Sequence, residues 1–358
     1  MSAHSGDVKI LSLNGGGARG LFTINVLAEI ERIIEQQTGQ SNVKAGEYFD
    51  LITGTSIGGI LALGLAAGKS ARELESVFRD QAPLIFPYRS SWRKKWRAAF
   101  GARYNSKPLL KAVVSMIGAE TTFGDLDRRV MIPTVNLSTG KPQFFKTPHN
   151  PSFNRDARLT LLDAAMATSA APTYFAPHYC AELDAYFADG GLVANNPSFI
   201  GLHEVFRDMT CDFPNATVAD VKVLNVGTLG EEYTVSPAAL AAKYNNGYLG
   251  LWGFGERLVL TTMTANQQLH KAMLERELWT HNALDNYVYL DDIIPNEAAS
   301  DITLDNASES SLRNLASRGK QLATNEFTKN SRLRAFFDQP SPPFCSGRRS
   351  PAPQETKK

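Results

Sequence analysis

The chain has 358 residues, 43% of them hydrophobic, which suits one large α/β domain with an added segment, or two domains. Its 37 basic and 36 acidic side chains nearly cancel, so its charge gives no indication of a nucleic-acid polymer as partner. The three cysteines (Cys180, Cys211 and Cys345) are scattered, which argues against a disulfide framework or a zinc site and fits a reducing cytoplasm.

The first elements in chain order alternate between strand and helix. Residues 8–13 (VKILSL) predict a buried strand, which leads into the glycine loop NGGGARG. Residues 21–39 have apolar side chains at helical spacing, with Gly39 as the expected C-cap. A second strand over 47–54 and a short apolar helix over 57–69 follow. This order predicts a largely parallel sheet with helices on its faces.

The middle of the chain predicts a helical stretch over 70–128 and then further strands. Strand-like runs lie at 129–137, 142–147 and 221–228, and a helix over 158–171 stops at Pro172. We assign residues 8–235 to one catalytic domain. Residues 236–338 have helical patterns with mixed charge and predict a segment that caps or extends this domain. The proline-rich residues 339–358 predict a disordered tail.

Two features bear on membranes. No signal peptide is recognisable, and the longest apolar run, residues 57–68, is too short to span a bilayer, so we expect a cytoplasmic protein. Residues 89–104 hold six basic residues and no acid, with Trp92, Trp96 and Phe100 at a spacing of four. Three interpretations stay open: an amphipathic helix that docks on an anionic membrane, a solvated helix whose aromatic residues pack on the core, or a phosphate-binding surface.

The sequence GTSIGG places Ser56 between a predicted strand and a predicted helix, with Gly54 and Gly58 on either side. A Gly-x-Ser-x-Gly turn in that context is typical of a nucleophile elbow, because the sharp turn leaves no room for side chains two residues before and after the serine. Ser56 is therefore the candidate nucleophile, and it needs a base.

Two candidate bases remain open at this point. His178, in APHYC, is the best histidine for a Ser-His-Asp triad, which would make the chain an esterase or peptidase. Asp189, in FADGG, could accept the serine proton itself if burial raised its basicity. Without such a role, Asp-Gly-Gly would simply be a turn.

The glycine loop has two interpretations. Gly15-x-Gly17-x-x-Gly20 fits the spacing of a dinucleotide-binding fingerprint, which would indicate an oxidoreductase. That fingerprint requires an acidic residue at the tip of the second strand, where this chain has ITGTS. The alternative is a nest of backbone N–H groups that holds the oxyanion of an ester under attack by Ser56.

The motifs NGGGARG, GTSIGG, TSAAPTYF and DGGLVANNP, in this order, resemble those of the patatin-like phospholipases over roughly residues 8–230. The resemblance implies a three-layer α/β/α sandwich and hydrolysis of lipid acyl esters by a Ser56–Asp189 dyad, without metal or cofactor. Asn14 stands where the family typically has Asp. The site residues that the resemblance implies are the oxyanion-hole residues Gly15, Gly16, Gly17 and Arg19 and the motif glycines Gly20, Gly54, Gly58, Gly190 and Gly191.

Within that family, residues 12–33 and 46–75 are similar to bacterial phospholipases of the CapV type, which a cyclic dinucleotide switches on in antiphage signalling. The resemblance implies a cyclic dinucleotide activator and a phospholipid membrane surface, at the inner membrane, as partners. No residue of an activator site can be named from the sequence, and whether the chain forms a homo-oligomer stays open. A catalytically silent membrane or signalling protein is a further alternative, although both Ser56 and Asp189 are present.

Overall fold

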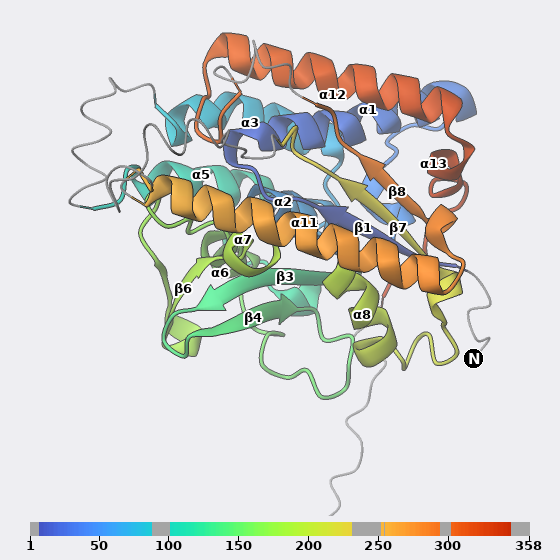
Figure 1. Cartoon of the computed structure of the whole chain (residues 1–358), viewed down its shortest axis with the longest axis horizontal. Coiled ribbons are helices and arrows are strands. Elements are labelled where there is room, and N and C mark those ends of the chain that lie inside the picture. The colour runs from blue at the N-terminus through green and yellow to red at the C-terminus, as the bar shows by residue number, and fades with distance from the viewer. Residues whose placement is uncertain (1–6, 88–100, 231–251, 254, 294–301, 345–358) are drawn as a thin grey trace, which may run out of the picture.

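The computed structural model describes residues 7–87, 101–230, 252–253, 255–293 and 302–344, and its framework is a single eight-stranded sheet (Figure 1). The strand order is β5-β6-β3-β2-β1-β7-β8, with β4 paired to β3. The strands are β1 (Val8–Leu13), β2 (Leu51–Gly54), β3 (Arg129–Asn136), β4 (Lys141–Lys146), β5 (His178–Cys180), β6 (Ala185–Asp189), β7 (Val221–Val226) and β8 (Tyr287–Leu290).

The pairing confirms a largely parallel sheet and adds an antiparallel edge. The strands β3, β2, β1, β7 and β8 run parallel to one another, so the carboxyl ends of β1 and β2 meet at one edge. In contrast, β4 and β6 both run antiparallel to β3, and β5 is antiparallel to β6. Thus β6 approaches the carboxyl edge from the opposite direction, and its last residue, Asp189, pairs with Thr134.

Alternation along β1 divides the core into two layers. Val8 and Ile10 pack into the cluster on one face of the sheet, whereas Leu11 and Leu13 pack into the larger cluster on the other. Successive side chains of a strand point to opposite faces, so a central strand covered on both faces is mostly apolar. This arrangement explains why apolar residues of β1 lie on both of its faces; Lys9 and Ser12 are its two polar residues.

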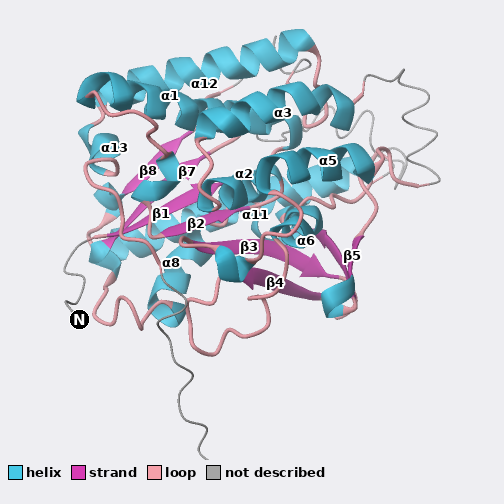
Figure 2. Ribbon diagram, turned by 180° about the vertical axis from the view of Figure 1, so that it is seen from behind, coloured by secondary structure: helices cyan, strands magenta, loops and turns pink. Residues whose placement is uncertain are grey.

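Helices cover both faces, which confirms the α/β/α sandwich. In Figure 1, α11 crosses in front of the sheet; seen from behind, α2, α3 and α5 lie in front of it (Figure 2). The larger layer holds α1, α2, α3, α5, α6 and α12, and the smaller holds α8 and the C-terminal half of α11. The helices are α1 (Gly20–Thr38), α2 (Ile57–Ala66), α3 (Ala71–Ile85), α5 (Ser106–Ile117), α6 (Leu161–Thr168), α7 (Gly191–Ala194), α8 (Ser198–Asp208), α11 (Glu256–Thr280), α12 (Glu309–Lys329) and α13 (Ser331–Ala335).

The first helix ends where the sequence predicts, and the second strand begins later than predicted. Gly39 adopts a left-handed conformation (φ 72°) and its N–H bonds to the Glu35 carbonyl, ending α1. The second strand is shorter than predicted, because residues 45–48 form a 3₁₀ turn and β2 begins only at Leu51.

The C-terminal segment both caps and extends the sheet. The expectation for 236–338 was a helical segment, yet Tyr287–Leu290 form the strand β8, which pairs in parallel with β7. Its helix α12 packs along α1 (Figure 1). Residues 339–344, expected in the disordered tail, are ordered: Ser341 N–H bonds to the Glu47 carbonyl and the Phe344 side chain is buried. Residues 345–358 lie outside the described part.

Most of the basic aromatic stretch, residues 88–100, also lies outside the described residues, so its three interpretations remain untested there. Arg103, at its end, is buried and donates to Glu256 and Asp305 at 2.6 and 3.1 Å. This arginine is therefore part of an internal ion-pair cluster and is unavailable to a membrane or a nucleotide.

The close approach of α12 to α1 gives a testable prediction. A Cβ added at Gly319 would lie 2.6 Å from the Phe22 carbonyl oxygen of α1, so Gly319→Val forces the two helices apart. We expect urea denaturation to give a free energy of unfolding about 1–3 kcal/mol lower, as for other overpacked cores. Ser317→Val places the same side chain on the exposed face of α12 and should change little. Equal stability of the two variants would contradict this packing.

Candidate active site

Ser56 lies at a strained turn between β2 and α2. It is the N-cap residue of α2 with φ 55° and ψ −125°, a conformation that a residue with a side chain adopts at a cost of about 1–3 kcal/mol. A Cβ at Gly54 would overlap the Gly58 carbonyl, and one at Gly58 would overlap the Leu13 carbonyl. Both glycines are thus required by close backbone approach, and the predicted elbow geometry is present.

Asp189 lies directly beneath Ser56. The Ser56 hydroxyl donates a 2.7 Å hydrogen bond to Asp189 Oδ2, and the Gly191 N–H donates to Oδ1 at 2.6 Å. Asp189 is fully buried, and this burial raises the pKa of its carboxyl to about 7, although the Gly191 and Ser56 hydrogen bonds act in the opposite direction. A carboxylate with such a pKa is basic enough to accept a hydroxyl proton near neutral pH.

The dyad is held by a segment that the sequence motifs contained but to which we assigned no role. Thr168, the last residue of α6, accepts the Ser56 N–H at its Oγ1 (3.1 Å) and donates to the Pro133 carbonyl (2.7 Å). Its own carbonyl accepts the Gly190 N–H. The position of this threonine within TSAAPTYF was the available signal.

The glycine loop faces Ser56, but its three glycines differ. The Gly15 N–H already donates to the Asn195 carbonyl at 3.0 Å, which corrects the expectation that all three amides are oxyanion donors. The amides of Gly16 and Gly17 have no acceptor among the described residues. These two N–H groups therefore remain as candidate oxyanion donors.

The glycine loop takes its shape from distant parts of the chain. Gly17 has φ +57°, and a Cβ there would overlap the Leu304 carbonyl, which accepts the Ala18 N–H at 2.8 Å. Gly20 begins α1 against Ile57. The loop is thus packed from both sides, and one of its supports comes from the C-terminal segment.

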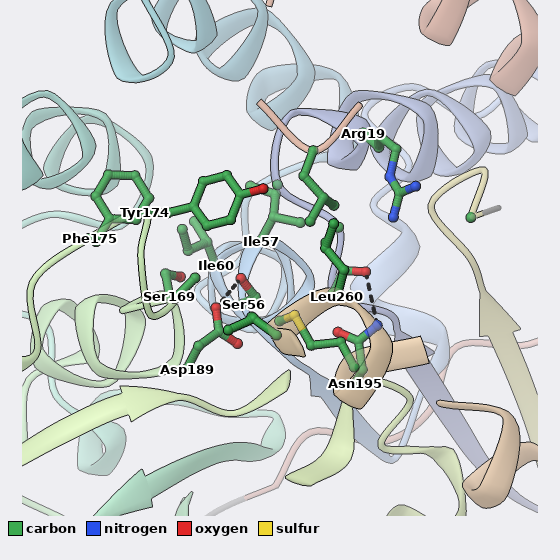
Figure 3. A pocket seen from close by; sticks show the side chains of 18 of the residues that line it. Arg19, Ser56, Ile57, Ile60, Ser169, Tyr174, Phe175, Asp189, Asn195 and Leu260 are labelled. Atoms are coloured by element: carbon green, nitrogen blue, oxygen red, sulfur yellow. Dashed lines mark hydrogen bonds between the residues drawn. The ribbon is translucent and has the colours of Figure 1, made fainter. Parts of the chain in front are cut away.

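Arg19 lines the same pocket, yet its guanidinium lies across the pocket from Asp189 (Figure 3). Its positive charge counters the effect of burial on the pKa of Asp291, which is nevertheless raised. Asp291 accepts hydrogen bonds from the Tyr289 hydroxyl (2.7 Å) and the Leu229 N–H (2.8 Å). The role of Arg19 in placing positive charge near the oxyanion therefore stays a prediction.

Asn14, which replaces the aspartate typical of the resembled family, belongs to this buried network. Its Oδ1 accepts from Asn225 Nδ2 at 2.8 Å, and its Nδ2 donates to the Tyr289 hydroxyl at 3.5 Å. An amide supplies both a donor and an acceptor here, which a carboxylate could not.

A deep apolar pocket leads away from Ser56 (Figure 3). It is partly open to solvent and runs between α2, α3 and α5. Its apolar wall includes Ile60, Phe78, Phe86, Leu109 and Phe175. A pocket with this apolar lining suits a hydrocarbon chain, with the reacting groups at one end.

Helix α11 covers the site and was not anticipated from the motifs. Asn266 accepts the Asn195 N–H at 2.8 Å and donates to the Gly191 carbonyl at 2.7 Å, while Gln267 accepts from Asn195 Nδ2 at 2.7 Å. At its first residue, Glu256 accepts the Tyr174 hydroxyl at 2.8 Å. The helix is therefore hydrogen-bonded to the loop that follows Asp189 and to the pocket wall.

The histidine alternative gains no support. None of the five histidines in the described ranges lines this pocket or bonds to Ser56. His178 instead pairs with Asp163, at 2.9 Å between Nε2 and Oδ1. The structure brings together Ser56 and Asp189, as one of the two interpretations expected, and not Ser56 and His178.

The described part of the chain holds neither a metal-binding cluster nor a membrane-spanning helix. In those residues, His, Cys, Asp and Glu side chains form no group of three or more that could hold a metal ion. Among the same residues, no helix combines the length and hydropathy needed to cross a bilayer.

Comparisons with known proteins agree with the motif order. The family model described as patatin-like phospholipase matches residues 11–200. The "cGAMP-activated phospholipase" of Vibrio cholerae serotype O1 is 71% identical over 343 residues, covering 94% of this chain and 96% of that protein. A protein with the same description from Escherichia coli (strain TW11681) is 67% identical, covering 94% of this chain and 94% of that protein. One from Pseudomonas aeruginosa is 40% identical, covering 88% of this chain and 87% of that protein.

The raised pKa of Asp189 predicts how stability changes with pH. The folded state holds this proton up to about pH 7, whereas an unfolded aspartate releases it near 3.8, so wild-type stability falls as the pH rises between these values. Asp189→Asn does not titrate and should gain stability relative to wild type over that interval, by at most about 1.4 kcal/mol per pH unit.

Thermal unfolding of both proteins between pH 5 and 8 measures this difference. Asp127→Asn, at an exposed side chain, is the control and should follow wild type. If the stability difference between Asp189→Asn and wild type stayed constant with pH, Asp189 would not titrate with the raised pKa.

Proposed function

Because this chain belongs to the patatin-like phospholipase family, we propose that it hydrolyses acyl esters of membrane phospholipids, with Ser56 as nucleophile and Asp189 as general base. The observation that carries this assignment is the 2.7 Å hydrogen bond between the Ser56 hydroxyl and the buried Asp189 carboxylate. Both lie at the end of an apolar pocket. No other described residue accepts the Ser56 hydroxyl proton.

Acylation begins when Ser56 Oγ attacks the ester carbonyl carbon and its proton passes to Asp189 Oδ2. The carbonyl oxygen becomes an oxyanion next to the Gly16 and Gly17 amides, and one such donor is typically worth about 3 kcal/mol of transition-state stabilisation. The bond to the leaving oxygen then breaks, and Asp189 returns the proton to that oxygen. The product is an acyl-Ser56 ester and a free alcohol, here a lysophospholipid.

Deacylation repeats the same proton transfers with water. Asp189 accepts a proton from water as the water oxygen attacks the acyl carbon, and the proton returns to Ser56 Oγ as the acyl–enzyme bond breaks. Burial of Asp189 supports both steps, because a carboxylate removed from water is more basic and exchanges its proton at neutral pH.

The pocket supports a long acyl chain as the substrate group bound. Its side chains from α2, α3 and α5 are aliphatic or aromatic beyond the dyad, and they would exclude water from the reacting ester. The fatty acyl chain occupies this pocket, while the head group stays at the open end.

A cyclic dinucleotide activates the enzyme. This part of the proposal is supported by three relatives described as cGAMP-activated phospholipases, two of which are more than 65% identical over 94% of this chain. The hydrogen bonds between α11 and residues 191–196 support a route for control, because a shift of α11 would displace the loop that follows Asp189.

Phospholipid hydrolysis tests activity and activation together. We expect wild type to release little fatty acid from phospholipid vesicles alone and at least about tenfold more with cyclic GMP-AMP, a change of about 1.4 kcal/mol in barrier. Ser56→Ala should be inactive in both conditions because it lacks the nucleophile.

A panel of other cyclic dinucleotides provides the ligand control. Full wild-type activity without any nucleotide would exclude activation, and fatty-acid release by Ser56→Ala would exclude the nucleophile assignment.

We further assign residues 89–100 of the basic aromatic stretch a part in docking on the membrane, whereas the buried Arg103 at its end takes no part. The support is its sequence: Trp92, Trp96 and Phe100 recur every four residues among basic residues, as in helices that lie at anionic interfaces. A phospholipase must reach its substrate at such an interface.

The double variant Trp92→Ala, Trp96→Ala should bind vesicles that contain an anionic phospholipid about tenfold more weakly in a sedimentation assay, since it loses two interfacial aromatic side chains. Trp279→Ala, which removes an exposed tryptophan of α11, is the matched control and should bind like wild type. Unchanged binding of the double variant would remove this role.

A further inference from the structure

The segment that ends α6 is fixed to both members of the dyad. Thr168 Oγ1 accepts the Ser56 N–H, and the Thr168 carbonyl accepts the Gly190 N–H at 3.2 Å. Two residues on, the Ala170 carbonyl accepts the Asp189 N–H at 3.0 Å. Ser169 lies between these bonds, so the backbone on both sides of it is held in place relative to Ser56 and Asp189.

The Ser169 hydroxyl is buried and takes no part in these hydrogen bonds. The residue is only 5% exposed, and its Oγ has no hydrogen-bond partner among the described residues. It lines the pocket that contains Ser56, and Figure 3 places it on the pocket wall beside Asp189. Burying a hydroxyl without a hydrogen-bond partner lowers the stability of the fold by about 1–3 kcal/mol. Such a group in a native structure therefore indicates a role other than stability.

The chemistry identifies which atom this hydroxyl would meet. The oxyanion is held on the side of the glycine loop, by Gly16 and Gly17. Besides the oxyanion and Ser56 Oγ, the reacting carbon is bonded to a third oxygen. This third oxygen is the leaving oxygen in acylation and comes from the attacking water in deacylation. Both exchange a proton with Asp189, so both must lie on its side of the carbonyl. Ser169 is on that side.

We infer that Ser169 is a further catalytic residue, whose hydroxyl hydrogen-bonds the oxygen that exchanges its proton with Asp189. In acylation it donates to the departing alkoxide oxygen while that oxygen receives the proton from Asp189. In deacylation its Oγ accepts one hydrogen of the water, while Asp189 takes the other as a proton. Ser169 itself gains and loses no proton. This inference rests on the proposed roles of Ser56 and Asp189.

Ser169→Ala separates the two half-reactions when a p-nitrophenyl ester is the substrate and cyclic GMP-AMP is present. The p-nitrophenolate leaving group is stable without a hydrogen bond, so the first-turnover burst should stay within about threefold of wild type. The steady-state rate should fall about tenfold or more, because water is no longer held; tenfold corresponds to the loss of one hydrogen bond. Phospholipid hydrolysis should fall at least as much, since its alkoxide leaves less readily.

A matched control comes from Ser198 at the start of α8. Its hydroxyl is also buried without a partner among the described residues, but it lies outside this pocket. Ser198→Ala should keep both the burst and the steady-state rate. Ser169→Thr retains a hydroxyl and should restore the steady-state rate over Ser169→Ala.

The outcomes distinguish this inference from the proposed function. A wild-type steady-state rate in Ser169→Ala, or an equal loss of burst and steady state, would overturn the role of Ser169 while leaving the dyad in place. Hydrolysis by Ser56→Ala, or none by wild type with the activator, would overturn the dyad and the role of Ser169 together.

Discussion

The hydrogen bond from Ser56 Oγ to Asp189 Oδ2 joins two residues 133 positions apart, and much of the structure is arranged around it. It requires a strained serine at the end of β2 and a carboxylate at the end of an antiparallel strand that reaches the same level of the sheet. It also requires burial, because a solvated aspartate would be a weak base. The same burial that raises the pKa of Asp189 to about 7 makes its ionised form costly, and the Gly191 N–H partly offsets that cost.

The site is completed by parts of the chain that lie beyond the family's motifs. The Leu304 carbonyl fixes the glycine loop through the Ala18 N–H, and α11 bonds to the loop after Asp189 through Asn266 and Gln267. The C-terminal segment is therefore an integral part of the catalytic architecture. A shift of α11 would therefore displace the loop after Asp189, which is the route of control proposed above.

The prediction of the fold from sequence succeeded where the signals are local. The buried strand over 8–13, the helix that ends at Gly39 and the elbow around Ser56 each follow from short-range sterics and periodicity. Order of motifs also identified the family, which the comparisons confirm. The strand β8 was missed because four residues within a helical region carry almost no periodic signal. The ordering of residues 339–344 was missed because it depends on contacts with Glu47 and Asp127.

The sequence by itself determined which residues can do the chemistry: a serine between two glycines, an aspartate before two more, and a glycine loop without a ribose-binding acid. Its residue patterns left Asp189 and His178 both open as bases, and only the resemblance to the family favoured Asp189. The distance between Ser56 and either residue is set by strand pairing across the sheet. Only the tertiary structure decided that Asp189 meets Ser56, that His178 pairs with Asp163, and that the Gly15 amide is already engaged. The physical reason is that hydrogen bonds and burial at such a site depend on long-range packing, whereas turn geometry and periodicity are properties of neighbouring residues.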